Sequence, residues 1–296
     1  MKKFAVGRPP HRFPELPGAT TPLELNKALR NHFFPGESAR PFDSILLPFR
    51  DCPALAADEV GRALARSSPL SAPGPHITPN SVWKRIHRVA PHLIQDLLAP
   101  LVAHGFRPPR LQMADSIVLD KPGKPSYDST SSFRVILLLQ LFSKILERIM
   151  TSRLSCVASV AGLLDPHKCG SVAGISASDA TTTLTQEVRT LRITGRHVST
   201  LLLDIKKRFN NVNPAILCSM LKAKAVNPYL VSWTRSFLTG RKCRLRYPGS
   251  PNVFAPVAVG TPQAPASPCS CLVFMFPDST PRSPRAPPSP MSTTFV

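Results

Sequence analysis

The stretch LLLDIKKRFNNV, residues 201–212, decides how this chain is interpreted. Its leucines form a short apolar run that is typical of a buried strand, and Asp204 stands where that strand would emerge. Lys206, Lys207 and Arg208 follow closely, so a neighbouring cation could simply neutralise the aspartate. A carboxylate at a strand end can also be a site residue. This stretch by itself leaves both interpretations open.

The flanking chain predicts a mixture of helices and strands. Apolar residues recur at helical spacing in seven segments, which are 23–34, 58–66, 80–89, 91–104, 178–193, 214–224 and 228–238. Short strands are predicted at 116–119, 197–203 and 240–247, and residues 131–154 are predicted to run from a strand into a helix. The elements do not alternate strictly as strand, helix and strand, which favours an α+β fold.

Two details of these helices can be predicted from single residues. Gly105 follows the segment 91–104 and is a suitable residue to end a helix. In the helix after the strand of 131–154, an apolar face is predicted from Ile145, Leu146, Ile149 and Met150. The charged residues Lys144, Glu147 and Arg148 are expected to lie away from that face.

Charge and hydropathy limit the class of function. The 296 residues contain 37 Lys and Arg against 17 Asp and Glu, a formal net charge of +20, which favours a polyanionic partner such as nucleic acid. The longest apolar run, Val135 to Phe142, is too short to span a membrane. The first residues lack the apolar core of a signal peptide, so an intracellular protein is expected.

Cysteine and proline usage indicate reduced thiols and an unfolded tail. The seven cysteines are scattered and include no Cys-x-x-Cys pair for zinc. Residues 277–290, PDSTPRSPRAPPSP, contain six prolines and almost no apolar side chains, so a disordered segment is expected there. The folded body is predicted to end near Phe276.

Five segments in order resemble the reverse transcriptase of non-LTR, LINE-type retrotransposons of the jockey and Tad kind. They are APGP at 72–75, VLDKPGKP at 118–125, SSFRVILLLQLFSKILERIMTSRL at 131–154, GRHVSTLLLDIKKRFNNV at 195–212 and WTRSFLTGRKCRLRYPG followed by VAVGTPQ within 233–263. Each segment alone is a weak signal, but the ordered set is highly specific.

The resemblance implies a right-hand polymerase fold. It assigns residues 1–69 to a helical lead-in, 70–195 to a fingers-like region, 196–276 to a partial palm and 277–296 to the disordered tail. The palm of this family is a small antiparallel sheet with helices on one face. The family's partners are an RNA template and a DNA primer, and its habit of copying at chromosomal targets implies a nuclear location.

The resemblance also assigns roles to single residues. Asp204 matches a palm aspartate that holds Mg²⁺ for attack of a primer hydroxyl on a phosphate. Phe209 matches the aromatic residue that excludes ribonucleotides, with an ordinary core position as the alternative. Arg134 matches an arginine that meets the incoming triphosphate, and Gln263 matches a glutamine of the nucleotide and template pocket.

Further basic residues are candidates for phosphate contacts. Lys121 and Lys124 lie in a predicted loop beside a glycine, where solvated side chains are an equally good interpretation. The basic strand GRKCRLR is expected to contribute to a nucleic-acid surface through Arg241, Lys242, Arg244 and Arg246.

Departures from the family indicate an inactive, truncated and degenerate copy. Lys207 and Arg208 replace two small residues beside the triphosphate, and Asn210 replaces a second aspartate. The Tyr/Phe-x-Asp-Asp turn is absent, and Asp278 is the only acid after Asp204. The Mg²⁺ site is therefore predicted to be incomplete. The alternatives are a non-catalytic nucleic-acid-binding protein and a non-functional pseudogene product.

Overall fold

The computed structural model describes residues 14–34, 51–69, 71–72, 74–75, 78–164, 169, 175–202, 212–247, 249–257, 260–261 and 291–295. The chain divides into two compact units. The first consists of residues 1–150 and 209–268, and the second consists of residues 151–208 and 269–296.

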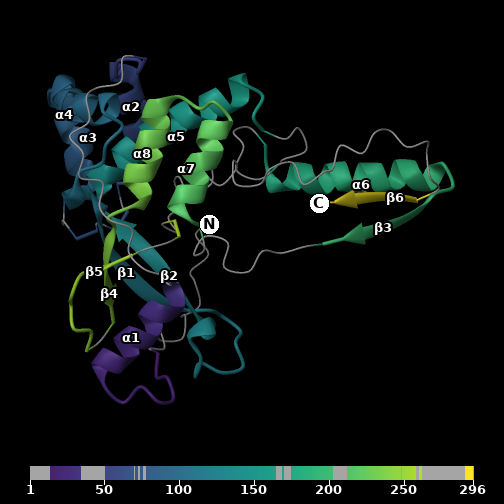
Figure 1. Cartoon of the computed structure of the whole chain (residues 1–296), viewed down its shortest axis with the longest axis horizontal. Coiled ribbons are helices and arrows are strands. Elements are labelled where there is room, and N and C mark those ends of the chain that lie inside the picture. The colour runs from purple at the N-terminus through teal and green to yellow at the C-terminus, as the bar shows by residue number, and fades with distance from the viewer. Residues whose placement is uncertain are drawn as a thin grey trace, which may run out of the picture. The chain divides into compact units, whose positions relative to one another are not determined.

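The first unit contains most of the helices that the structure describes. They are α1 Pro22–Phe33, α2 Ala57–Ala65, α3 Asn80–Val89, α4 Pro91–Ala103, α7 Pro214–Ala223 and α8 Pro228–Leu238, and α5 Leu141–Val160 begins there. Figure 1 shows α1 at one end of the sheet of this unit and α2, α3, α4 and α8 toward the other end. The helices predicted for this unit from apolar spacing are confirmed, with ends within one residue of the prediction.

Local capping explains why these boundaries are predictable. At the start of α1, the Glu24 N–H donates to Thr21 Oγ1 at 3.2 Å while the Thr21 N–H donates to Glu24 Oε2 at 3.0 Å. That second hydrogen bond, from the Thr21 backbone, is the main reason why the pKa of Glu24 is lowered. At α7, the Asn213 side chain accepts from the N–H groups of Ala215 and Ile216, and Pro214 follows as the first helical residue.

The sheet of the first unit has four strands in the order β2-β1-β4-β5. They are β1 Met113–Asp120, β2 Phe133–Leu139, β4 Lys242–Arg246 and β5 Ala255–Pro256. β1 pairs antiparallel with β2, with Ile117 opposite Ile136, and it pairs parallel with β4, with Ile117 opposite Arg246. The strand β4 lies in the region predicted as palm, yet it joins β1 and β2 from the region predicted as fingers.

This arrangement corrects one expectation from the sequence. The α+β class with a small sheet is confirmed. Within that sheet β4 pairs antiparallel with β5, as expected from residue 196 onward, but it pairs parallel with β1, which was not expected. The reason is long-range: residues 113–117 and 242–246 are far apart in the chain, and a strand's own sequence does not choose its partner.

One face of the sheet forms the core of the first unit. Side chains alternate along each strand, so that Val118, Phe133 and Leu245 are buried while their neighbours are more exposed. Leu29 and Phe33 of α1 pack into the same cluster. Helix α1 therefore covers the buried face of the sheet.

Helix α5 follows β2 and confirms the predicted apolar face. Ile145, Leu146, Ile149 and Met150 are all buried. Glu147, which was expected away from that apolar face, is also buried, at 1% exposure. A helix surrounded by other elements buries more than one face, so its polar residues are buried together with its apolar ones.

The second unit contains α6 Ala177–Ile193, β3 His197–Leu201 and β6 Met291–Phe295. β3 and β6 pair in parallel, with His197 opposite Met291 and Leu201 opposite Phe295. The strand predicted at 197–203 is confirmed as far as Leu201. Residues 277–290, where disorder is predicted, lie outside the described residues, while the last part of the predicted tail forms β6.

The described helices do not meet the requirements of a membrane span. Within the part of the chain that the structure describes, no helix has both the length and the apolar composition needed to cross a bilayer.

Candidate nucleic-acid interface

The face of the sheet opposite the core carries the predicted basic residues. The outward positions of β1 and β2 are half-buried and apolar in the middle, where Ile117 lies opposite Ile136. Two arginines lie on the same face. Arg134 of β2 is the cross-strand partner of Leu119, and Arg246 of β4 is the cross-strand partner of Ile117. Both arginine side chains are exposed, as is Lys242. We call this set, Arg134, Lys242 and Arg246 around Ile117 and Ile136, the outward sheet face.

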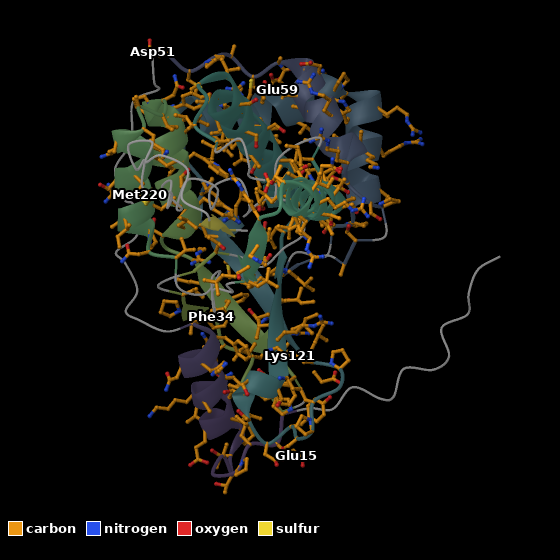
Figure 2. The ribbon with its side chains drawn as sticks, turned by 90° about the vertical axis from the view of Figure 1, so that its right-hand side faces the viewer. Glu15, Phe34, Asp51, Glu59, Lys121 and Met220 are labelled. Carbon is orange, nitrogen blue, oxygen red and sulfur yellow. The ribbon has the colours of Figure 1, made fainter. Side chains whose placement is uncertain are left out.

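The loop after β1 closes back on itself at one end of the sheet. Lys121 Nζ donates to Ser131 O at 2.8 Å, and Tyr127 Oη donates to Lys121 O at 2.8 Å. Figure 2 labels Lys121, which lies far from Glu59 of α2. Gly123 adopts a positive φ of 75°, which a side chain would disfavour, and Lys124 beside it is exposed. Lys124 is therefore free to reach a partner, whereas Lys121 is partly used to hold the loop.

Arg244 belongs to a partly buried ion pair. Its Nε donates to Asp115 Oδ1 at 2.8 Å and its Nη2 donates to Asp115 Oδ2 at 3.1 Å, and the two side chains are only 18% and 13% exposed. The pair is possible because Asp115 of β1 and Arg244 of β4 are register partners. The guanidinium also lies 4.7 Å from the centre of the Phe254 ring. These contacts hold β4 beside β1.

Arg241 corrects the prediction of a surface role. Its side chain is 4% exposed, and its guanidinium donates to Leu238 O at 2.9 Å and to Gly260 O at 2.5 Å. Burial, together with the positive charge of Arg107, lowers the pKa of Arg241 to about 10. Leu238 O, at the end of α8, and Gly260 O both accept hydrogen bonds from this guanidinium. The Arg241 side chain is turned inward because these backbone carbonyls need a donor.

Three predicted site residues lie outside the described residues. These are Asp204, Phe209 and Gln263. β3 ends at Leu201, shortly before Asp204. Among the residues that the structure does describe, no group of three His, Cys, Asp or Glu side chains is placed so that it could hold a metal ion. The assignment of Mg²⁺ to Asp204 therefore stays a prediction.

Comparison with known proteins then decides the family. The model of the family described as reverse transcriptase (RNA-dependent DNA polymerase) matches residues 119–281, which is more than half of the 296 residues. The chain belongs to the reverse transcriptase family.

The curated relatives place this reverse transcriptase domain among those of non-LTR retrotransposons. It is 27% identical over 240 residues to the "Probable RNA-directed DNA polymerase from transposon X-element" of Drosophila melanogaster, covering 81% of this chain and 24% of the relative. It is 28% identical over 158 residues to the "Probable RNA-directed DNA polymerase from transposon BS" of the same species, covering 53% and 17%. The chain spans about a quarter or less of the length of these relatives.

A buried polar cluster in this reverse transcriptase domain was not predicted from the sequence. Arg107, 1% exposed, lies in the loop after α4, and its Nη2 donates to Ser143 Oγ of α5 at 2.7 Å and to Leu111 O at 2.5 Å. Burial lowers the pKa of Arg107 to about 10, while the charge of Glu147 partly offsets that effect. The Ser143–Glu147 spacing of four residues on a largely apolar helix was the one available signal.

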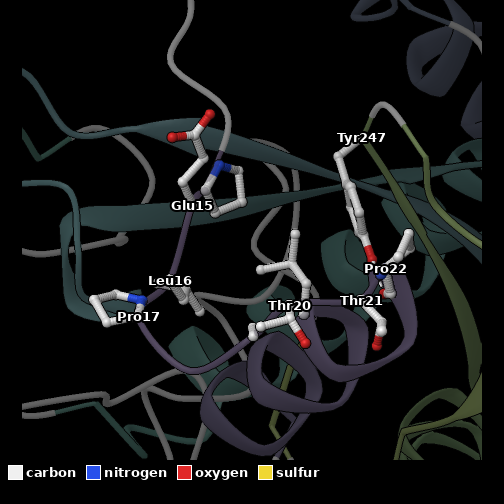
Figure 3. A pocket seen from close by; sticks show the side chains of 10 residues that line it. Glu15, Leu16, Pro17, Thr20, Thr21, Pro22 and Tyr247 are labelled. Carbon is white, nitrogen blue, oxygen red and sulfur yellow. Dashed lines mark hydrogen bonds between the residues drawn. The ribbon is translucent and has the colours of Figure 1, made fainter.

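A pocket of the domain lies away from these groups. Its lining includes Pro14, Pro17, Pro22, Leu25 and Tyr247, and Figure 3 shows Tyr247 pointing toward Pro22. The Tyr247 hydroxyl donates to Pro22 O at 3.0 Å, and burial raises the pKa of that hydroxyl. None of the predicted site residues lines this pocket, so it is not the predicted nucleotide site.

Proposed function

We propose that this chain is a non-LTR reverse transcriptase domain that does not polymerise DNA by itself. The proposal rests on the acid content of the matched palm motif: Asp204 is its only carboxylate, because Asn210 stands where the family has a second aspartate. Catalysis by two Mg²⁺ ions needs several carboxylates, because each ion prefers near-octahedral oxygen coordination and gives up its water reluctantly. Lys207 and Arg208 stand where the family has two small residues, so their long side chains would crowd the place where the triphosphate approaches the backbone.

This proposal predicts that primer extension is absent. The purified chain, with cooperative unfolding checked first by circular dichroism, is expected not to extend a DNA primer annealed to an RNA template in Mg²⁺ or Mn²⁺. Asp204→Ala is then expected to change nothing, because no activity depends on it. Extension that disappears in the Asp204→Ala variant would show that the chain is an active polymerase, and a reverse transcriptase of known activity serves as the positive control.

A second function, non-catalytic binding of nucleic acid, is favoured by the outward sheet face. Exposed Arg134 and Arg246 lie beside the apolar side chains of Ile117 and Ile136, and exposed Lys242 lies farther along the same face, opposite Met113. Cations for phosphates therefore share a face with apolar side chains on which bases can pack. The net charge of +20 adds long-range attraction for a polyanion. The partners proposed from the family are an RNA template and a DNA primer.

Arg246 and Arg244 lie on the same strand but differ in exposure: Arg246 is exposed, whereas Arg244 is paired with Asp115. Arg246→Gln is expected to weaken binding of a single-stranded RNA several-fold and to reduce the slope of log K against log salt by about one, because one phosphate contact is lost. Arg244→Gln is expected to leave that slope unchanged but to lower the free energy of unfolding by about 1–2 kcal/mol, since it breaks the partly buried pair with Asp115.

The two variants are compared by fluorescence anisotropy over a series of salt concentrations and by urea unfolding. Both must be assayed at a temperature where they are folded. An equal change in the slope of log K against log salt in both variants would mean that the Arg244–Asp115 pair opens on binding. An unchanged slope in both variants would show that the outward sheet face does not contact the nucleic acid.

A further inference from the structure

Helices α3 and α4 expose large apolar side chains to solvent. The exposed fractions are 41% for Val82, 73% for Val89, 48% for Leu93 and 58% for Leu97. Val82 and Val89 are seven residues apart on α3, and Leu93 and Leu97 are four residues apart on α4, so each pair lies on one face of its helix. Val89 and Leu93 flank Ala90, where α3 ends and α4 begins. We call these four residues the α3–α4 apolar surface.

These side chains are not needed for the core of their own unit. The buried face of α4 consists of Ile94, Leu98 and Val102. Helix α3 packs through Trp83, whose ring centroid lies 4.7 Å from that of Phe142 on α5. Both helices therefore already have an inward-facing side, and the α3–α4 apolar surface is a second, outward-facing one. Clusters of exposed apolar side chains are typical of sites that bind another protein.

Positive charge lies on the α3 side of this surface, while the exposed Asp96 lies on the α4 side. Lys84, Arg85 and Arg88 lie on α3, whereas Asp96 is the only acid of α3 and α4. Arg85 and Arg88 are exposed, and Arg85 lies three residues from Val82 and four from Val89, on the same side of the helix. A partner must therefore offer apolar side chains for the middle and negative charge for the edge.

We propose that the α3–α4 apolar surface binds an amphipathic helix of another protein, with leucine-type residues on one face and Glu or Asp along its border. A helix fits because apolar side chains at spacings of four and seven residues on two successive helices match the ridges of a third helix. A second copy of this chain fits poorly, since each copy carries a formal net charge of +20 and would bring cations to cations.

The test uses a defined probe with the full chain. A fluorescein-labelled helical peptide of about 18 residues, with Leu at heptad positions and Glu at the flanking positions, is titrated by fluorescence anisotropy. It is expected to bind, and Leu97→Glu is expected to weaken binding about tenfold or more. The matched control is Ile216→Glu on α7, which changes an equally exposed apolar residue of the same unit at 56% exposure and is expected to bind normally.

Charge complementarity is tested by a swap. Arg85→Glu with Arg88→Glu is expected to lose the Glu-edged peptide and to gain a peptide in which every Glu is replaced by Lys. Val89→Ser serves as the second apolar variant if Leu97→Glu does not fold.

Several outcomes would overturn the proposal. One is equal binding of the Glu-edged and Lys-edged peptides to the original chain, and another is normal binding by both Leu97→Glu and Val89→Ser. Sedimentation showing a dimer that Leu97→Glu dissociates would assign the surface to a second copy. RNA binding weakened by the double Arg variant, with no binding of either peptide, would assign it to nucleic acid.

Discussion

Replacing Gly105 with alanine should destabilise the first unit by about 3–4 kcal/mol. Gly105 follows the last residues of α4 with a φ of +53°, and its N–H donates to Val102 O at 3.0 Å while the Phe106 N–H donates to Leu101 O at 2.9 Å. A Cβ at this position would overlap Tyr229 O of α8 and would lie 3.2 Å from Ser232 Cβ. The variant therefore combines a left-handed backbone strain with a clash against backbone that cannot move aside.

Gly123→Ala is the matched control for this prediction. Gly123 also has a positive φ, +75°, but an added Cβ would meet nothing within 4 Å, so a loss of only about 1–2 kcal/mol is expected. Urea unfolding is followed by tryptophan fluorescence, which reports on the first unit because both tryptophans, Trp83 and Trp233, lie there. Equal midpoints for the two variants would mean that α4 and α8 separate easily at Gly105.

Arg107→Met should be as damaging as the change at Gly105, with an expected loss of about 3–5 kcal/mol. The substitution keeps much of the volume but removes the donors to Ser143 Oγ and Leu111 O and the charge that acts on buried Glu147. It also removes a guanidinium that lies 4.8 Å from the centre of the Phe237 ring. A buried carboxylate that loses an opposite charge is costly, because it cannot be hydrated.

Two further variants separate charge from packing. Arg110→Met changes an exposed arginine three positions away and is expected to alter the free energy of unfolding by less than about 0.5 kcal/mol. Arg107→Met combined with Glu147→Met is expected to recover part of the loss, because replacing both charges with apolar groups relieves the buried carboxylate. A double variant less stable than Arg107→Met alone would show that Glu147 stabilises the unit through other partners.

The helices could be predicted from the sequence because their signals are local. The capping box of Thr21 and Glu24, the proline that opens α7 and Gly105 after α4 act through neighbours within a few residues. Apolar spacing then located the buried side of each helix, as for Ile145 and Ile149 in α5. The family could also be predicted from the sequence, because it is recognised by motifs in a fixed order along the chain.

The functions of individual basic residues could not be predicted in this way. The sequence GRKCRLR predicts four similar cations, but the structure leaves Lys242 and Arg246 exposed, pairs Arg244 with Asp115 and buries Arg241 against carbonyl oxygens. The alternation of side chains along a strand predicts which of them share a face, but it does not predict which residues of other segments lie against that face.

The family and the helices could be predicted from the sequence alone, since both depend on residue types at short spacing or in fixed order. The incomplete set of carboxylates near Asp204 stays a prediction from the same source. Only the tertiary structure decided that β4 lies parallel to β1, that Glu147 and Arg107 are buried together, and that α3 and α4 keep an apolar surface exposed. These features depend on contacts between residues far apart in the chain, and the free energy of such contacts is set by packing and desolvation, which no local pattern records.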